Sequence, residues 1–178
     1  KAQRDAMPDD MSQVMPYIFR LCEGFNLPIL RVDGWEADDT IGTLAKKAEA
    51  EGFETFMVTP DKDFAQLVSG RTFIYKPPRS GGEVQILGVP EVLEHWKVER
   101  VEQVVDVLAL MGDSVDNIPG VPGIGEKTAQ KLIADFGSVE NLLEHVEDVK
   151  GKRRQVLAEN RRNALLSKRL VTIQTNVP

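Results

Sequence analysis

The chain has 178 residues, is 42% hydrophobic and 28% charged, and carries a formal net charge of −6. This length suits one domain, or one domain with a small appendage, and the composition is ordinary for a globular protein. No apolar run approaches the roughly 18 residues that cross a bilayer, no secretory signal pattern is present, and the lone Cys22 excludes an intrachain disulfide. We therefore expect a cytoplasmic monomer that does not engage a membrane, with Cys22 as a small core residue. Because the chain begins at Lys1 rather than Met, we also expect the natural polypeptide to start further upstream.

Charge is distributed unevenly along the chain. Residues 1–117 carry 12 Lys and Arg against 21 Asp and Glu, whereas residues 118–178 carry 10 against 7. An acidic part followed by a basic part suggests metal binding in the first and contact with phosphate in the second. Chance variation of the surface charge is the alternative.

Helical and strand patterns alternate in the first half. Apolar residues at helical spacing predict a helix over residues 11–25, and a short apolar run predicts a strand over residues 29–32. An amphipathic pattern with acids at its start predicts a helix over residues 36–51. The next predicted elements are a strand over 54–59, a short helix over 64–68, a strand over 72–76 and a hairpin strand over 84–87. This alternation predicts an α/β fold with a parallel sheet.

From residue 89 onward the pattern is helical. Predicted helices cover residues 90–96, 101–111, 126–136, 138–146, 155–158 and 161–171, with Ser138 as an N-cap. We therefore expect two domains, an α/β core over residues 1–88 and an all-α domain over residues 89–178.

Acidic residues follow the predicted strands. In an open parallel sheet, ligands bind outside the carboxyl ends of the strands, and Mg²⁺ prefers oxygen ligands. Two such ions about 4 Å apart stabilise both the attacking and the leaving oxygen in phosphoester hydrolysis. The candidate metal ligands are Glu36, Asp38 and Asp39 after the first predicted strand, Asp61 and Asp63 after the second, and Asp113 and Asp116 at the junction with the helical part.

Each group of acids also has a structural alternative. Asp38 and Asp39 lie in the first turn of a predicted helix, where acids are stabilising in any case. Asp61 could cap the short helix, and Asp113 and Asp116 could shape a turn. The joint placement at several ends of one predicted sheet favours the metal site.

A glycine-rich turn precedes the helix over residues 126–136. Gly120, Gly123 and Gly125 let the backbone approach a ligand closely, and the helix start offers free N–H groups to phosphate. Lys127 and Thr128 add a charge and a hydroxyl. A plain turn between two helices is the alternative. Six further basic residues either extend this phosphate-binding surface or form a solvated face: Lys150, Lys152, Arg153, Arg154, Arg161 and Arg162.

The segment GDSVDNIPGVPGIGEKTAQKL, residues 112–132, resembles the helix-hairpin-helix segment of the structure-specific 5′-nuclease family. Family segments Glu-Ala-Asp-Asp, Asp-Lys-Asp and Gly-Asp-x-x-Asp-Asn supply metal-binding carboxylates, and they match residues 36–39, 61–63 and 112–117. The resemblance implies a PIN-like or resolvase-like nuclease core followed by a helix-hairpin-helix subdomain. It also implies two Mg²⁺ ions, with Mn²⁺ as an alternative, and a K⁺ ion at the hairpin.

The opening residues resemble the basic arch motif Lys-x-x-Arg of that family. The match, Lys1 and Arg4, implies contact with the scissile phosphate. Family members also carry acids on a first strand upstream, so we expect this chain to cover the later part of the family domain. The resemblance implies cleavage of DNA at 5′ ends or 5′ flaps in replication and repair, with a covalently linked polymerase domain.

Two other functions are open. Because part of the acid cluster is missing, the chain could be a fragment that binds branched DNA without cutting it. A small-molecule phosphohydrolase could use the same acids, but such a substrate needs no turn that grips a duplex backbone.

Overall fold

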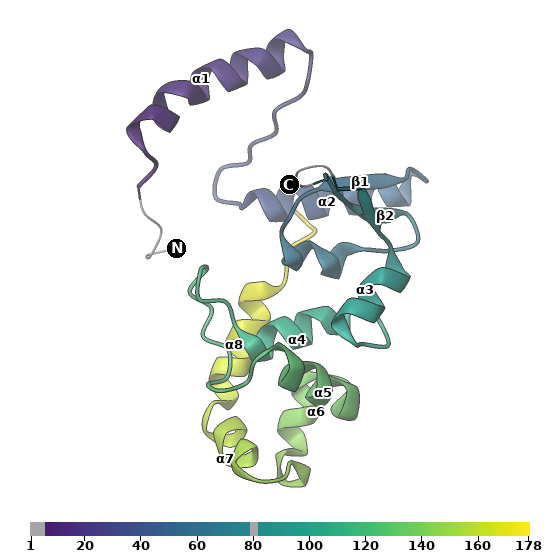
Figure 1. Cartoon of the computed structure of the whole chain (residues 1–178), viewed down its shortest axis with the longest axis vertical. Helices are drawn as coiled ribbons and strands as arrows, with labels where there is room; N and C mark the ends of the chain where they lie inside the picture. Colours follow the sequence, from purple (N-terminus) through teal and green to yellow (C-terminus); the bar gives the residue numbers. More distant parts are fainter. Residues whose placement is uncertain (1–5, 79–81) are drawn as a thin grey trace.

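The structure is a computed structural model, and it describes residues 6–78 and 82–178. Lys1 and Arg4 therefore lie outside the described residues. The elements in chain order are α1 (Asp9–Gly24), α2 (Ala37–Ala50), β1 (Thr55–Val58), η1 (Lys62–Leu67), β2 (Thr72–Lys76), β3 (Gln85–Leu87), α3 (Val89–Trp96), α4 (Gln103–Met111), α5 (Glu126–Phe136), α6 (Val139–Glu144), η2 (Val146–Asp148), α7 (Lys152–Glu159) and α8 (Arg161–Val171). In Figure 1, α2 and the sheet lie on one side of a helical part formed by α3–α8, and α1 stands apart.

The described residues form a three-stranded sheet in the order β1-β2-β3. β1 pairs with β2 in parallel, with Thr55 opposite Thr72, and β3 returns antiparallel to β2, with Leu87 opposite Ile74. The predictions of a parallel pair and of a hairpin strand are both confirmed. The connection between β1 and β2 is η1, which places the Asp-Lys-Asp segment directly after β1.

Before residue 36 the predicted helix is confirmed, but the predicted strand and the predicted core position of Cys22 are not. The predicted strand over residues 29–32 is wrong: among the described residues it pairs with no strand, and Ile29 and Leu30 are exposed. A strand needs a hydrogen-bonding neighbour, which an apolar run alone does not supply. The helix α1 forms as predicted, but none of its residues is buried, and Cys22 is half-buried rather than in the core.

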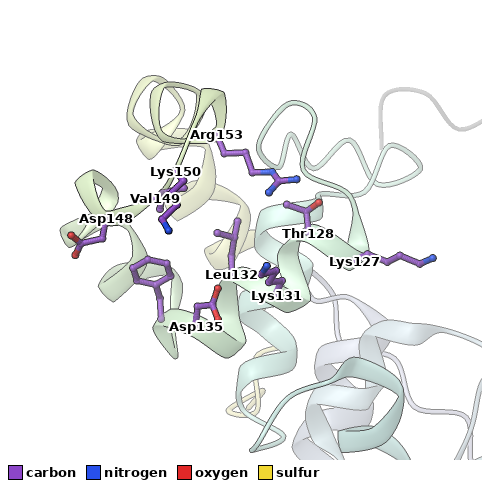
Figure 2. Close-up of a pocket in the computed structure, with 10 residues that line it drawn as sticks. Lys127, Thr128, Lys131, Leu132, Asp135, Asp148, Val149, Lys150 and Arg153 are labelled. Carbon is purple, nitrogen blue, oxygen red and sulfur yellow. The ribbon is translucent and has the colours of Figure 1, made fainter.

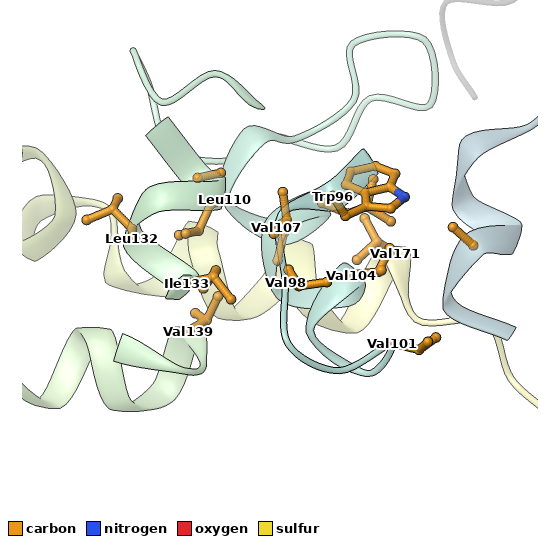
Figure 3. Close-up of a cluster of buried hydrophobic side chains, with 14 of the residues drawn as sticks. Trp96, Val98, Val101, Val104, Val107, Leu110, Leu132, Ile133, Val139 and Val171 are labelled. Atoms are coloured by element: carbon orange, nitrogen blue, oxygen red, sulfur yellow. The ribbon is translucent and has the colours of Figure 1, made fainter. Parts of the chain in front are cut away.

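The main core lies in the helical part, around α4. Val104, Val107 and Leu110 of α4 are fully buried and lie among side chains of α5 and α8, including Ile133 and Val171 (Figure 3). Apolar residues occur on all sides of α4 because α5, α6 and α8 all pack against it. The helical part is therefore organised around one fully enclosed helix.

One carboxylate is buried inside this core. Asp106 of α4 accepts hydrogen bonds from Val139 N at 2.9 Å and from Lys168 Nζ at 2.6 Å. Lys168 also donates to Glu140 at 2.6 Å. Burial by itself lowers the pKa of Lys168, but its bonds to Asp106 and Glu140 outweigh burial and raise that pKa above its usual value. These contacts connect α4, α6 and α8. The predicted N-cap is confirmed, because Ser138 Oγ accepts from Asn141 N.

After α8 the chain returns to the α/β part and ends near α2 (Figure 1). Gln66 of η1 donates to Val171 O and accepts from Ile173 N, both at 2.9 Å. Asp39 of α2 accepts from Gln174 N at 2.8 Å. The C-terminal segment therefore fixes the helical part against two of the elements that carry predicted metal ligands. Within the described ranges, no helix is both long and apolar enough to cross a membrane.

Candidate metal centre and phosphate-binding surface

Most of the predicted metal ligands line one cavity of about 360 Å³, here called the acid pocket. Its acidic residues are Glu36, Asp38, Asp39, Asp63 and Asp116. The end of α8 and the segment that follows it, residues 169–174, form another part of the wall and include Arg169. The sequence analysis did not identify this wall, because it comes from the opposite end of the chain.

The start of α2 contributes three of these acids. Glu36 is the N-cap residue, and its backbone N–H donates to Asp39 Oδ2 at 3.3 Å. Asp39 therefore has a structural role at the helix start, which was the alternative to a metal ligand. Its other oxygen, Oδ1, accepts a hydrogen bond from Gln174 N. Asp38 lies one residue earlier, in the first turn, and lines the acid pocket.

Asp61 and Asp63 have different surroundings although they are two residues apart. Asp61 Oδ1 caps η1 by accepting from Asp63 N at 3.0 Å, and Asp61 lines a separate cavity beside His95 and Trp96. Asp63 lines the acid pocket, and its Oδ1 is buried without a hydrogen-bond partner among the described residues. Burial, and to a smaller extent repulsion from the Asp61 charge, raises the pKa of Asp63 to about 6. A buried, unsatisfied carboxylate oxygen is a suitable ligand for a cation.

Asp113 and Asp116 lie in a turn that a bridge between Asp113 and Ile118 closes. Asp113 Oδ1 accepts from Val115 N at 2.8 Å and from Asp116 N at 3.3 Å. Asp113 Oδ2 accepts from Lys62 Nζ at 2.6 Å. Asp116 lines the acid pocket, whereas Asp113 does not.

The ion pair between Lys62 and Asp113 stabilises the charged form of both groups. Burial alone would raise the pKa of Asp113, but the Lys62 ammonium and the backbone N–H of Val115 outweigh it and hold that pKa below its usual value. Burial alone would lower the pKa of Lys62, and Asp113 outweighs it in the same way, so the pKa of Lys62 is raised. Both side chains are therefore charged near neutral pH.

The acids are gathered but do not form a chelating group. Within residues 6–78 and 82–178, no three His, Cys, Asp or Glu side chains are placed to hold one metal ion. The donor set nevertheless fits a hard divalent cation, since all the ligands are carboxylate oxygens and one of them, on Asp63, is buried without a partner in the described part of the chain. Side-chain movement would accompany ion binding.

Two of the three predicted glycines in the glycine-rich turn have backbone angles that favour glycine. Gly120 and Gly123 have φ angles of +58° and +75°, which side chains disfavour. A Cβ atom on Gly120 would lie 2.6 Å from Gly112 N, so the turn passes directly against the acidic segment. Gly125 has φ −90° and serves as the N-cap residue of α5.

Basic side chains follow this turn into a cleft of about 520 Å³ between α5 and residues 148–153, here called the basic cleft (Figure 2). Its cations are Lys127, Lys131, Lys150 and Arg153, with Thr128 beside them. Leu132, Phe136 and Val149 give it an apolar surface, and Asp135 and Asp148 also line it. The sequence analysis missed Lys131, although its position four residues after Lys127 places both on one helix face.

Comparison with known families gives two matches that together span nearly the whole chain. Residues 1–97 match the family described as 5′-3′ exonuclease, N-terminal resolvase-like domain, and residues 99–178 match the one described as 5′-3′ exonuclease, C-terminal SAM fold. The chain belongs to the 5′-3′ exonuclease family. The expected combination of a resolvase-like α/β part and a helical part is confirmed.

Relatives in this exonuclease family include bacterial DNA polymerases. The chain is 42% identical over 181 residues to DNA polymerase I of Bacillus subtilis, with all of this chain and 20% of the relative covered. It is also 42% identical over 178 residues to the thermostable DNA polymerase I of Thermus thermophilus, covering 100% of this chain and 21% of the relative. The chain therefore spans about a fifth of the length of these relatives.

Solved structures show the same fold. The bacteriophage T5 flap endonuclease, in a complex with DNA and metal ions, aligns with a TM-score of 0.79 at 26% identity, covering 98% of this chain and 64% of that one. The catalytic core of Rad2 with a DNA substrate aligns with a TM-score of 0.62 at 17% identity, covering 99% and 59%. At that identity the Rad2 likeness supports the fold alone.

Proposed function

We propose that this member of the 5′-3′ exonuclease family is a metal-dependent 5′→3′ exodeoxyribonuclease and 5′-flap endonuclease that acts on DNA in replication and repair. The observation that carries the proposal is the acid pocket with its buried, unsatisfied Asp63 oxygen, in a chain whose glycine-rich turn leads into α5 and so into the wall of a basic cleft. Family membership and the flap endonuclease relative support the reaction class.

The acids would hold two Mg²⁺ ions, with Mn²⁺ as an alternative. The candidate ligands remain Glu36, Asp38, Asp39, Asp61, Asp63, Asp113 and Asp116. A divalent ion bound there would supply positive charge to polarise the phosphoester. The solved structure of T5 5′-exonuclease with bound zinc ions, 26% identical to this chain, supports a site for divalent metal ions.

The remaining residues would bind and orient the substrate. Gly120, Gly123 and Gly125 let the backbone of the turn approach the duplex, and Lys127 and Thr128 contact phosphate at the start of α5, with K⁺ as a candidate ion at the turn. Lys1 and Arg4 would stabilise charge on the reacting phosphate. In this proposal residues 1–88 carry most of the metal ligands, and residues 89–178 add Asp113 and Asp116 and bind DNA.

The DNA polymerase I relatives support a covalently linked polymerase domain in the natural polypeptide. We propose that the protein acts as a monomer in the cytoplasm, where bacterial DNA is replicated.

The test is cleavage of a 5′-labelled flap duplex in Mg²⁺ and in EDTA by the chain extended at its N-terminus to restore the upstream acids, with Asp63→Asn as the site variant. We expect cleavage in Mg²⁺ only, and a loss of at least about a hundredfold in the variant, because it removes a ligand that neutral Asn replaces poorly. Lys46→Met, in an ion pair with Glu49 outside the pocket, is the control and should cleave normally. Cleavage that persists in EDTA would contradict the proposal.

A second candidate is a protein that binds branched DNA without cutting it. The observation in its favour is that no three acids in the described residues already form a chelating group. Salt-sensitive binding of flap DNA with no cleavage in Mg²⁺ or Mn²⁺ would establish this function instead.

A further inference from the structure

The two acidic segments are joined by a lysine that the nuclease assignment does not use. Lys62 lies between Asp61 and Asp63 at the start of η1, and its ammonium reaches across 51 residues of sequence to Asp113. The Nζ to Oδ2 distance of 2.6 Å is that of a short, charge-assisted hydrogen bond. One cation thus holds the segment after β1 against the turn after α4.

The contact occupies the oxygen of Asp113 that a metal ion would need. Asp113 Oδ1 already accepts from the backbone N–H groups of Val115 and Asp116, which fixes the orientation of the carboxylate within its turn. Oδ2 remains, and Lys62 binds it. The Asp113 side chain is only 17% exposed, so a second cation has little room to approach beside the ammonium.

We propose that Lys62 is an internal cation that competes with the divalent metal for Asp113, so that the ion pair forms in the metal-free protein and opens when metal binds. The inference rests on the proposed function, since that function makes Asp113 a metal ligand. It adds a positioning residue that sets the metal affinity of the site.

Charge explains why such a residue is useful. Asp61, Asp63, Asp113 and Asp116 lie close enough that the other three all raise the pKa of Asp63. Without a cation this repulsion would separate the two segments, and the ammonium offsets part of it. A divalent ion carries twice the charge of the ammonium, so it can displace Lys62 while keeping the segments together.

A purely structural ion pair is the alternative, and the molecule contains one for comparison. Lys168 pairs with Asp106 within the helical core, and neither residue lines the acid pocket. A pair of that kind stabilises the protein to the same extent with and without a metal ion. The two cases are therefore distinguished by how the stabilising effect responds to metal.

The experiment measures Mn²⁺ binding by calorimetry and the melting temperature in EDTA and in saturating Mn²⁺. The variants are Lys62→Met, which removes the cation, Lys62→Gln, which keeps a hydrogen-bond donor without charge, and Lys46→Met as the control for a lost surface lysine. We expect Lys62→Met to bind Mn²⁺ about fivefold more tightly, Lys62→Gln to show a smaller gain, and Lys46→Met to match the unchanged protein. In EDTA, Lys62→Met should melt about 3 °C lower, and saturating Mn²⁺ should abolish this difference.

Two results would overturn the inference in distinguishable ways. Equal Mn²⁺ affinity in the unchanged protein and both Lys62 variants, with a melting deficit that persists in Mn²⁺, would show a structural ion pair and leave the proposed function intact. No Mn²⁺ binding by any of the proteins would remove the metal assignment itself, and the proposal for Lys62 with it.

Discussion

The helical part and the acid pocket each contain a partly or fully buried carboxylate, and the two are treated in opposite ways. Asp106, 5% exposed, has both a backbone donor and the Lys168 ammonium as partners. Asp63 has one oxygen without a partner in the described part of the chain, and its burial, together with the charges of Asp61, Asp113 and Asp116, raises its pKa. A satisfied buried carboxylate is a structural element, whereas an unsatisfied one among like charges needs a cation from outside.

The apolar residues show the same contrast. Val104 and Val107 of α4 are fully buried, whereas Phe56 and Val58 of β1 are 48% and 68% exposed. Burial of apolar surface is the main source of stability, and the fully buried residues of α4 contribute it at the centre of the helical part. The α/β part instead places reactive groups at the ends of its elements.

The junction between these regions should be the most sensitive position in the chain. Gly120→Ala would place a Cβ atom 2.6 Å from Gly112 N at a φ angle of +58°. We expect a loss of about 4 kcal/mol in the free energy of unfolding, measured in urea, because neither backbone can move without breaking the turn. Gly123→Ala is the matched control, since its φ is +75° but no atom lies within 4 Å of the new Cβ. It should cost only about 1 kcal/mol, and an equal loss in both variants would contradict the steric argument.

Lys168→Met tests the satisfied carboxylate. It leaves Asp106 buried with only the Val139 N–H as a partner, and we expect a loss of about 3 kcal/mol in the free energy of unfolding. Lys46→Met breaks a more exposed ion pair with Glu49 and should cost less than about 0.5 kcal/mol. Metal ions should not alter either value. If the two variants were equally stable, the burial of Asp106 would not be the source of the effect.

Asp63→Asn tests the unsatisfied carboxylate and should raise, rather than lower, the free energy of unfolding. Since folding raises the pKa of Asp63 from 3.8 to about 6, the folded protein binds more protons than the unfolded chain between these values, and its stability falls as pH rises through them. In EDTA the variant should equal the unchanged protein near pH 4 and exceed it above pH 7. A full conversion of the shift gives about 3 kcal/mol, and solvent screening of this partly exposed group reduces the expected gain to about 1 kcal/mol.

Urea unfolding at pH 4, 6 and 7.5 measures this difference. Addition of Mg²⁺ should reverse it, because the cation stabilises only the protein that retains the carboxylate. A variant that is less stable than the unchanged protein at pH 7.5 in EDTA would show that the charged Asp63 carboxylate does not destabilise the folded protein.

The predictable parts of the structure are those set by nearby residues. The helices after residue 89 and the strands β1 and β2 follow from periodicity within each segment. The strand predicted over residues 29–32 is absent because a strand depends on a distant partner. The acids were found because they lie in segments that resemble those of the 5′-nuclease family. The sequence did not show that Asp63 lies inside the acid pocket and Asp61 outside it, because that depends on side-chain direction, which residue spacing does not specify.

Contacts between residues far apart in the sequence could not be predicted either, because residue spacing within one segment does not specify them. The ammonium of Lys62 meets Asp113 across 51 residues, and Gln174 meets Asp39 across 135. Neither pair has a periodic signal. Lys131 differs, because its position one helical turn after Lys127 was available from the pattern.

The smallest expected effect concerns Lys131 and the basic cleft. If Lys131 contacts a phosphate of the duplex, Lys131→Ala should weaken binding of flap DNA about threefold and should lower the slope of log affinity against log salt by about one. Lys46→Ala removes a lysine from the α/β part, away from the cleft, and should leave the slope unchanged. Fluorescence anisotropy with a labelled duplex, from 50 to 200 mM salt in EDTA, separates binding from cleavage. A weaker affinity with an unchanged slope would mean that Lys131 acts through the packing of α5 rather than by neutralising a phosphate, and the DNA contact would then end at the turn and the first residues of that helix.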